Sequence, residues 1–170
     1  MSELVLKNLV IRDLQKKEYH LLREFIYHAI FRKDPSLEIP QSIIEEAEIK
    51  NYISDFGRKH DFGKVVEVDG KIVAVAWTRL LNGEIKGYGY IDEETPEFAI
   101  AVLPEYQGKG IGTKLLRNLL QYLKALGYKQ AALAVQKENP ALYLYLKVGF
   151  YIARIKEEEY VLIHDLFVIK

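Results

Sequence analysis

The chain has 170 residues, of which 49% are hydrophobic and 28% are charged, a composition usual for one compact globular domain of this length. Its 24 basic and 24 acidic residues give a net charge of zero, which argues against general nucleic-acid binding, because that function needs a basic face. The chain has no cysteine, so disulfides, thiolate metal sites and cysteine nucleophiles are excluded. We expect one domain over residues 1–170.

The N-terminal stretch does not have the pattern of a targeting segment. In MSELVLKNLVIRDL, apolar residues alternate with polar and charged ones, so the uninterrupted apolar run of a signal peptide is missing. No stretch of the sequence approaches the roughly 20 apolar residues that a membrane span requires. We therefore expect a cytoplasmic protein without a membrane partner.

The first half of the chain is predicted to contain one strand, two helices and a hairpin. Residues 4–11 are expected to form a strand, and apolar side chains recur at helical spacing over residues 15–31. A second helix is expected over residues 41–56, with Ser42 as its cap. Asp69-Gly70 separates two β-rich runs, which is typical of a two-residue hairpin turn.

The second half is predicted to alternate strands with helices. The largely apolar segment 96–103 is expected to be a strand buried on both faces. The elements expected after it are a helix from Ile111 to Leu126, a strand over 128–136, a short helix over 139–150 and two closing strands over 150–156 and 160–169. The order β-α-α-β-β-β-α-β-α-β-β predicts a mixed α/β sheet, with a parallel right-handed crossover around the helix that begins at Ile111.

Three glycines precede this helix or begin it, in the segment YQGKGIGTKLLRNLL. The start of a helix leaves its first N–H groups unpaired and carries partial positive charge, so it attracts anions. Glycine lets phosphate oxygens reach those donors, because it has no β-carbon. No Gly-Lys-Ser/Thr of a P-loop occurs, and Gly108-x-Gly110-x-Gly112 lacks the Rossmann spacing. The segment is predicted to bind a pyrophosphate, although the same glycines could serve only to form a tight turn.

Two motifs make the chain similar to a known family. The segment Gln107-Gly-Lys-Gly110-Ile-Gly112 has the form Q-x-x-G-x-G and follows AVLPEY, and NPALYLYLKVGF comes after the next predicted strand. In these features the chain resembles the GNAT superfamily of acetyl-coenzyme A dependent N-acetyltransferases. The resemblance implies a mixed, mostly antiparallel sheet of about seven strands flanked by about four helices, with parallel central strands that splay apart.

The resemblance also implies where the coenzyme binds. The backbone amides from Gln107 to Thr113 would hold the pyrophosphate, and the strand before them would pair its backbone with the pantetheine arm and offer one amide to the thioester carbonyl. Asn139 is similar to a residue that bonds the pantetheine arm, and it also suits a helix cap. The residues expected to bind acetyl-coenzyme A are Ile100, Ala101, Val102, Leu103, Gln107, Gly108, Lys109, Gly110, Ile111, Gly112, Thr113 and Asn139.

Two residues are candidate catalytic groups. Tyr145, in the second motif, resembles the phenol that protonates the departing thiolate as a general acid. Glu97 is the candidate base, directly or through a water molecule, because the attacking amine must be neutral and Glu97 begins the strand that leads to the thioester. A core tyrosine and an exposed acidic turn are the structural alternatives for the two residues.

The acceptor is expected to be a primary amine, either a small molecule or a protein N-terminus. In the family, specificity comes from the first two helices, their loop and the segment before the fourth strand. The residues in question here are Tyr27, His28, Phe31, Asp34 to Glu38, Trp77, Arg79, Tyr88 and Tyr90. Aromatic rings and carboxylates would suit a cationic amine, but Glu45, Glu46 and Glu48 could equally form a solvated helix face.

Other functions stay open at this point. The four histidines are scattered without the spacing of metal ligands, so no metal is expected. A catalytically inactive sensor or scaffold that binds acetyl-coenzyme A is the alternative to an enzyme, and transfer of a longer acyl group is a third possibility. The apolar final strand could join two chains in a homodimer, or it could be an inner strand of the sheet.

Overall fold

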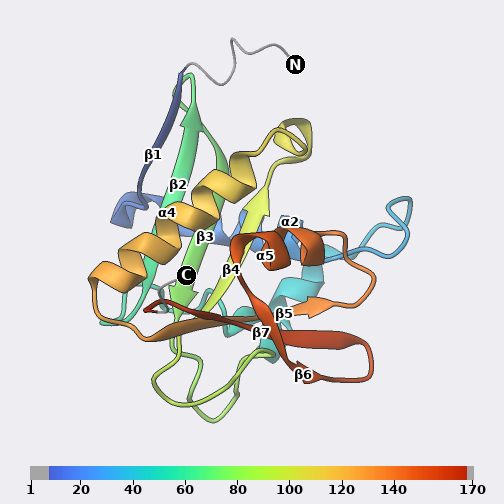
Figure 1. Cartoon of the computed structure of the whole chain (residues 1–170). Helices are drawn as coiled ribbons and strands as arrows, with labels where there is room; N and C mark the ends of the chain where they lie inside the picture. The colour runs from blue at the N-terminus through green and yellow to red at the C-terminus, as the bar shows by residue number, and fades with distance from the viewer. Residues whose placement is uncertain (1–7, 168–170) are drawn as a thin grey trace.

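The computed structural model describes residues 8–167 and arranges seven strands in one sheet (Figure 1). The strands are β1 (Leu9–Asp13), β2 (Phe62–Val68), β3 (Lys71–Arg79), β4 (Glu97–Val102), β5 (Gln130–Gln136), β6 (Tyr151–Ile155) and β7 (Glu159–Asp165). Their spatial order is β1-β2-β3-β4-β5-β7-β6. All neighbours are antiparallel except β4 and β5, which are parallel. The mixed, mostly antiparallel sheet is therefore confirmed.

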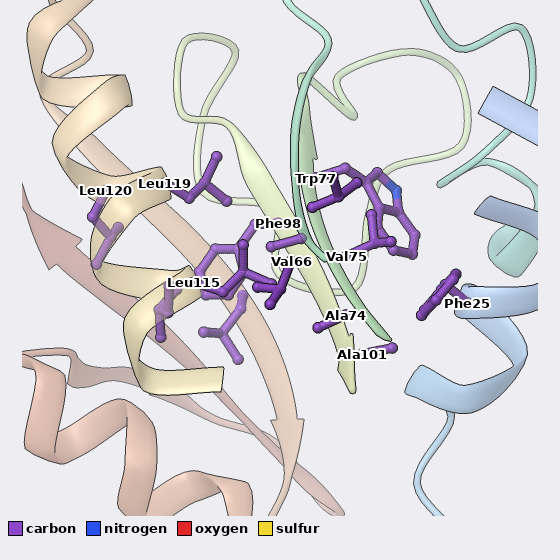
Figure 2. Packing of buried hydrophobic residues seen from close by; sticks show 14 of the residues in the cluster. Phe25, Val66, Ala74, Val75, Trp77, Phe98, Ala101, Leu115, Leu119 and Leu120 are labelled. Carbon is purple, nitrogen blue, oxygen red and sulfur yellow. The ribbon is translucent and has the colours of Figure 1, made fainter. Parts of the chain in front are cut away.

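Helices cover both faces of this sheet. The α-helices are α2 (Leu22–Ala29), α3 (Ala47–Lys50), α4 (Ile111–Ala125) and α5 (Ala141–Val148), and the 3-10 helices are η1 (Lys16–Leu21), η2 (Gln41–Glu45) and η3 (Pro104–Tyr106). Figure 2 shows Leu115 and Leu119 of α4 on one side of the central strands and Phe25 of α2 on the other. The buried residues of α4 recur at helical spacing, so this helix packs a single apolar stripe on the sheet.

The predicted hairpin is confirmed between β2 and β3. Asp69 and Gly70 both have positive φ, 51° and 80°, as a two-residue turn of type I′ requires. The two strands that it joins are antiparallel and pair Val68 with Lys71 next to the turn. The turn chemistry of two residues thus fixes the pairing of two central strands.

The two helices predicted in the first half are each shorter than expected. The first is η1 followed by α2, and the second is divided into η2 and α3, because Glu46 between them has extended backbone, with φ −63° and ψ 133°. Ser42 lies inside η2 and is not a cap, since Pro40 takes the cap position. After α3 the chain turns, and the carbonyls of Asn51 and Ser54 accept hydrogen bonds from Arg79 instead of continuing a helix.

The two ends of the chain differ from the prediction in smaller ways. The first strand runs two residues beyond Ile11, to Asp13, while residues 4–7 lie outside the described part of the chain. The final strand is an inner strand between β5 and β6, and its expected residues 168 and 169 also lie outside the described part. Pairing of two chains through this strand is therefore not available, and a homodimer by another surface stays a prediction.

Arg79 anchors the segment after α3 to the sheet, and we expect its loss to be costly. Its guanidinium contacts both oxygens of Asp61, at 3.2 and 2.9 Å, and both side chains are almost fully buried. An Arg79→Met variant leaves a buried carboxylate without its partner, so the free energy of unfolding should fall by about 3–5 kcal/mol, measured by urea titration at neutral pH.

The control is Arg58→Met. Arg58 pairs with Asp55 at 3.6 Å, and their side chains are 59% and 88% exposed, so this change should cost less than about 1 kcal/mol. Equal losses in the two variants would contradict the anchoring role of Arg79.

Candidate functional site

The glycine-rich segment forms a loop between β4 and α4. Gly108 and Gly110 have φ of 74° and 82°, in the left-handed region that glycine adopts most readily. The side chain of Gln107 donates a hydrogen bond of 3.0 Å from Nε2 to the carbonyl of Val102. Gln107 therefore ties the loop to the end of β4, and the helix starts immediately after Gly110.

The backbone amides of this loop are free to bind a ligand. The first backbone hydrogen bond of α4 runs from the amide of Lys114 to the carbonyl of Gly110, at 3.2 Å, and within residues 8–167 none of the loop and helix-capping backbone bonds is donated by an amide from Gly108 to Thr113. A β-carbon placed on Gly108 or Gly110 would meet no atom within 4 Å. Unpaired amides at a helix start, with open space before them, fit a pyrophosphate.

Gly112 differs from the other two glycines. A β-carbon at this position would lie 3.7 Å from the side chain of Val102 and 3.8 Å from that of Leu144, which is ordinary packing distance. The start of α4 therefore lies close to the side chains of Val102, at the end of β4, and of Leu144 in α5. The loop thus opens at the place where β4 ends.

The two parallel strands splay apart beyond the start of β4. β4 pairs with β3 along its whole length, but with β5 only at Glu97 and Ala132. The amide of Leu103 donates to the carbonyl of Val73 on the β3 side, and the direction of backbone groups alternates along a strand. The amides of Ile100 and Val102 therefore face the gap, whereas those of Ala101 and Leu103 face β3. This narrows the expected pantetheine contacts to Ile100 and Val102.

The gap between β4 and β5 opens into a cleft of about 670 Å³, a volume typical of small-molecule sites. Ile100 of β4 and Val135 of β5 belong to its walls, and Asn139 and Tyr145 approach it from the α5 side. Tyr52 and Tyr88 line it as well. The cleft is thus formed where the sheet is incomplete, and the loops that follow α3 and β3 contribute to its walls.

Tyr145 is a buried phenol in this cleft. Its ring packs edge-on against Phe98 and Phe150, with centroids 6.1 and 5.9 Å away, and the residue is 7% exposed. Burial raises the pKa of Tyr145 to about 12, so the hydroxyl keeps its proton at neutral pH. Tyr143, two residues away, is 75% exposed and lies on another face of α5.

Asn139 stands at the start of α5 with its side chain bound to the backbone. Its Oδ1 accepts a hydrogen bond of 2.9 Å from the amide of Ala141, the first residue of the helix. Pro140 takes the cap position of α5, so Asn139 lies one residue before the cap, binds the first amide of the helix and also lines the cleft.

Glu97 is a buried carboxyl at the start of β4. Its Oε2 accepts hydrogen bonds from the hydroxyl of Tyr52 at 2.9 Å and from the amide of Gly89 at 3.0 Å, while Oε1 has no partner among the described residues. Burial raises the pKa of Glu97 to about 7, which suits a group that exchanges protons at neutral pH. Glu97 is 2% exposed and is not among the residues that line the cleft.

Tyr52 is the residue of this site that sequence reasoning missed. It lies in the segment predicted as a helix over residues 41–56, and its partner Glu97 is 45 residues away. No local spacing connects the two positions. Only the fold brings the loop after α3 beside the start of β4.

Several residues expected to contact the acceptor lie elsewhere. Trp77 and Arg79 are 1% exposed and belong to the packing beneath Tyr52, which excludes them from direct contact with a substrate. The carboxylates that line the cleft are Glu46, Glu157, Glu158 and Glu159. Lys156 lies among them, donates to the carbonyl of Tyr88 at 2.8 Å and pairs with Glu159 at 3.4 Å.

Residues 8–167 contain neither a cluster of metal ligands nor a membrane-spanning helix. No three histidine or acidic side chains in this part of the chain lie close enough to hold a metal ion together. Within the same residues, none of the helices is both long and apolar enough to cross a bilayer.

Comparisons with known proteins place this geometry in context. The family model described as "Acetyltransferase (GNAT) family" matches residues 23–150. The [ribosomal protein bS18]-alanine N-acetyltransferase of Haemophilus influenzae is 32% identical over 119 residues, which cover 59% of this chain and 82% of that protein. The spermidine N(1)-acetyltransferase of Escherichia coli is 36% identical over 74 residues, which cover 42% of this chain and 37% of that protein.

Solved structures show the same fold. The ribosomal-protein-S18-alanine N-acetyltransferase from Escherichia coli superposes with a TM-score of 0.65 at 17% identity, over 95% of this chain and 96% of that one. The PaiA N-acetyltransferase from Thermoplasma acidophilum, solved in complex with coenzyme A, gives a TM-score of 0.65 at 19% identity, over 97% and 99%.

Proposed function

Because the chain belongs to the GNAT family of acetyltransferases, we propose that it moves the acetyl group of acetyl-coenzyme A directly to a primary amine. The chain is thereby an enzyme with acetyl-coenzyme A as its cosubstrate. The observation that carries the proposal is the free amide row from Gly108 to Thr113 in the loop that follows β4, together with the cleft between β4 and β5 that contains Tyr145. We also propose that residues 1–170 form one N-acetyltransferase domain, and the cytoplasmic location stays a prediction.

The residues of the loop and the splay fit the coenzyme. The amides from Gly108 to Thr113 would hold the pyrophosphate at the positive end of α4, with Lys109 beside them. Ile100 and Val102 would offer backbone groups to the pantetheine arm, as an added strand does, and the Val102 amide is the donor available for the thioester carbonyl. Asn139 would meet the arm from the opposite side of the cleft.

The reaction needs a proton acceptor for the amine and a proton donor for the sulfur. The bound cosubstrate supplies a thioester carbonyl that a neutral amine can attack. Glu97, with its pKa at about 7, takes the proton that an ammonium group must lose first. Tyr145 holds its proton at neutral pH and gives it to the departing thiolate. Alignment of amine and thioester in the cleft contributes further.

We propose a cationic amine as the acceptor, either a small molecule or a protein N-terminus. Four carboxylates and the rings of Tyr52 and Tyr88 line the cleft, and both features favour a positive charge. The relatives described above carry the names of an alanine N-acetyltransferase and a spermidine acetyltransferase. These names support both kinds of acceptor without deciding between them.

A panel of amines tests the proposed function. Polyamines, amino acids, aminoglycosides and short peptides are incubated with acetyl-coenzyme A, and coenzyme release and the mass of each product are recorded. We expect at least one cationic amine to be acetylated. Binding of acetyl-coenzyme A without acetylation of any amine would favour the sensor or scaffold instead.

The dependence of turnover on pH should follow the ionisation of Glu97. A carboxyl accepts a proton only when it is ionised, so kcat/KM should rise tenfold for each unit of pH below the pKa of about 7 and level off above it. The measurement is the rate of coenzyme release with the best acceptor of the panel. In Glu97→Gln this inflection should disappear, and its persistence there would remove Glu97 from the mechanism.

A further inference from the structure

Glu97 cannot reach an acceptor by itself in this arrangement. Glu97 is buried and does not line the cleft, whereas Tyr52, whose hydroxyl donates to its carboxylate, is a lining residue. A proton that leaves an amine in the cleft therefore needs a carrier. We propose that the Tyr52 hydroxyl passes the proton of the amine to Glu97, an inference that rests on the proposed acetyl transfer.

The hydrogen bonds of Tyr52 fix the direction of transfer. The amide of Tyr88 donates to the Tyr52 oxygen at 2.9 Å, and an amide can only donate, so the Tyr52 oxygen accepts there. Its own proton is then directed to Oε2 of Glu97, 2.9 Å away. A phenol oxygen accepts two hydrogen bonds, so one acceptor position is left for a donor from the cleft.

The position of Tyr52 is held by contacts on three sides. Its ring stacks on that of Tyr88, with centroids 6.2 Å apart and planes at 15°. Its carbonyl accepts a hydrogen bond of 2.9 Å from Nε1 of Trp77, and Arg79 binds the carbonyl of Asn51 next to it at 3.0 Å. A relay must keep donor and acceptor aligned, and these contacts provide that alignment before any substrate binds.

The proton transfer balances without a charged phenol. The N–H bond of the ammonium breaks and its proton passes to the Tyr52 oxygen, while the O–H bond of Tyr52 breaks and its proton passes to Glu97. Amine, phenol and carboxyl are all neutral afterwards, and Glu97 returns the proton to solvent by the same route. A concerted transfer is required, because burial and the charge of Glu97 both raise the pKa of Tyr52 above its usual range.

Within residues 8–167, few other charged groups affect Glu97. Lys156, just after β6, and Glu159, the first residue of β7, act on the pKa of Glu97 with opposite signs. Arg79, which pairs with Glu97 in the register of β3 and β4, forms its salt bridge with Asp61. The loop that carries Tyr88 contributes the amide of Gly89, and a β-carbon at Gly87 would fall 2.1 Å from Oε1. Tyr52 is thus the titratable group that bonds Glu97 directly.

Three variants test the relay through a double-mutant cycle. Tyr52→Phe, Glu97→Gln and the double variant are compared with wild type by kcat/KM, using the acceptor of the panel with the fastest turnover. Both single variants should lose about 100-fold, and the double variant should lose no more than either, because the residues act as one unit. Tyr128→Phe, which removes a hydroxyl bound to His60 outside the cleft, is the control and should keep the wild-type rate.

A titration of the ligand-free protein provides a readout that does not depend on turnover. The carboxyl carbons of glutamate are labelled with ¹³C, and the pKa of Glu97 is measured by NMR in wild type and in Tyr52→Phe. The hydrogen bond from Tyr52 favours the ionised carboxylate, so its removal should move the pKa of Glu97 to a higher value. An unchanged pKa would overturn the contact on which the relay depends.

The outcomes separate the relay from acetyl transfer itself. If wild type acetylates an amine and Tyr52→Phe does so at the same rate, or if the two losses multiply in the double variant, the relay alone is overturned. If wild type acetylates no amine of the panel, the proposed function fails and the relay fails with it.

Discussion

A Gly110→Asp variant should bind acetyl-coenzyme A at least about 100-fold more weakly than wild type, because loss of two charge-assisted hydrogen bonds costs about 3 kcal/mol or more. The space before Gly110 is open to 4 Å, and in the proposed complex the pyrophosphate occupies it. An aspartate side chain fills this space and adds a negative charge next to the phosphates. Isothermal calorimetry measures the change in affinity directly.

Gly70→Asp is the matched control for this experiment. Gly70 has a φ of 80°, against 82° for Gly110, and a β-carbon at either position meets no atom within 4 Å. The two substitutions therefore carry the same backbone strain and the same charge, but Gly70 lies in the β2-β3 turn. Gly70→Asp should bind the coenzyme as wild type does. Equal affinities for the two variants would show that the glycine loop does not hold the pyrophosphate.

A Tyr145→Phe variant should lose about 100-fold or more in kcat with acetyl-coenzyme A affinity nearly unchanged, since general acid catalysis contributes 10²- to 10⁴-fold. The change removes only the hydroxyl. The ring keeps its contacts with Phe98 and Phe150, and burial alone raises the pKa of Tyr145, so no ionic partner is left without its contact. Steady-state kinetics with the best amine, together with calorimetry, separates turnover from binding.

Tyr143→Phe on the same helix is the control for Tyr145→Phe. Tyr143 is 75% exposed and lies outside the cleft, so its hydroxyl should be dispensable. If Tyr145→Phe turned over at the wild-type rate, protonation of the thiolate would have to come from another group. A parallel loss of affinity and turnover in Tyr145→Phe would instead indicate a role in binding.

Turns and helices that depend on residues close together in the chain were predicted well from the sequence. Asp69-Gly70 adopts the two positive φ angles that its residue types favour, and the leucines of α4 leave only one way to bury a helix on the sheet. The helix expected over residues 41–56 was wrong in its centre, because Glu46 is extended and Arg79 binds carbonyls of the following turn. Such a contact between distant residues outweighs local helix propensity, and the local sequence does not indicate it.

The candidate site was predictable to a similar degree. The Q-x-x-G-x-G motif indicated the free amides, because the motif covers one loop and the start of one helix and does not depend on distant residues. Which backbone groups of β4 face the gap depends on the register with β3, so the sequence could not distinguish Ile100 and Val102 from Ala101 and Leu103. The link from Tyr52 to Glu97 needs the whole fold.

The most direct test is an NMR titration of ¹⁵N-labelled protein with acetyl-coenzyme A, followed at each backbone amide. Binding at the proposed site predicts the largest shifts at residues 108–113, together with shifts at Ile100 and Val102, whose amides face the gap between β4 and β5. Saturable shifts confined to other parts of the chain, or no shifts in a folded protein, would contradict the assignment of this loop and cleft as the acetyl-coenzyme A site.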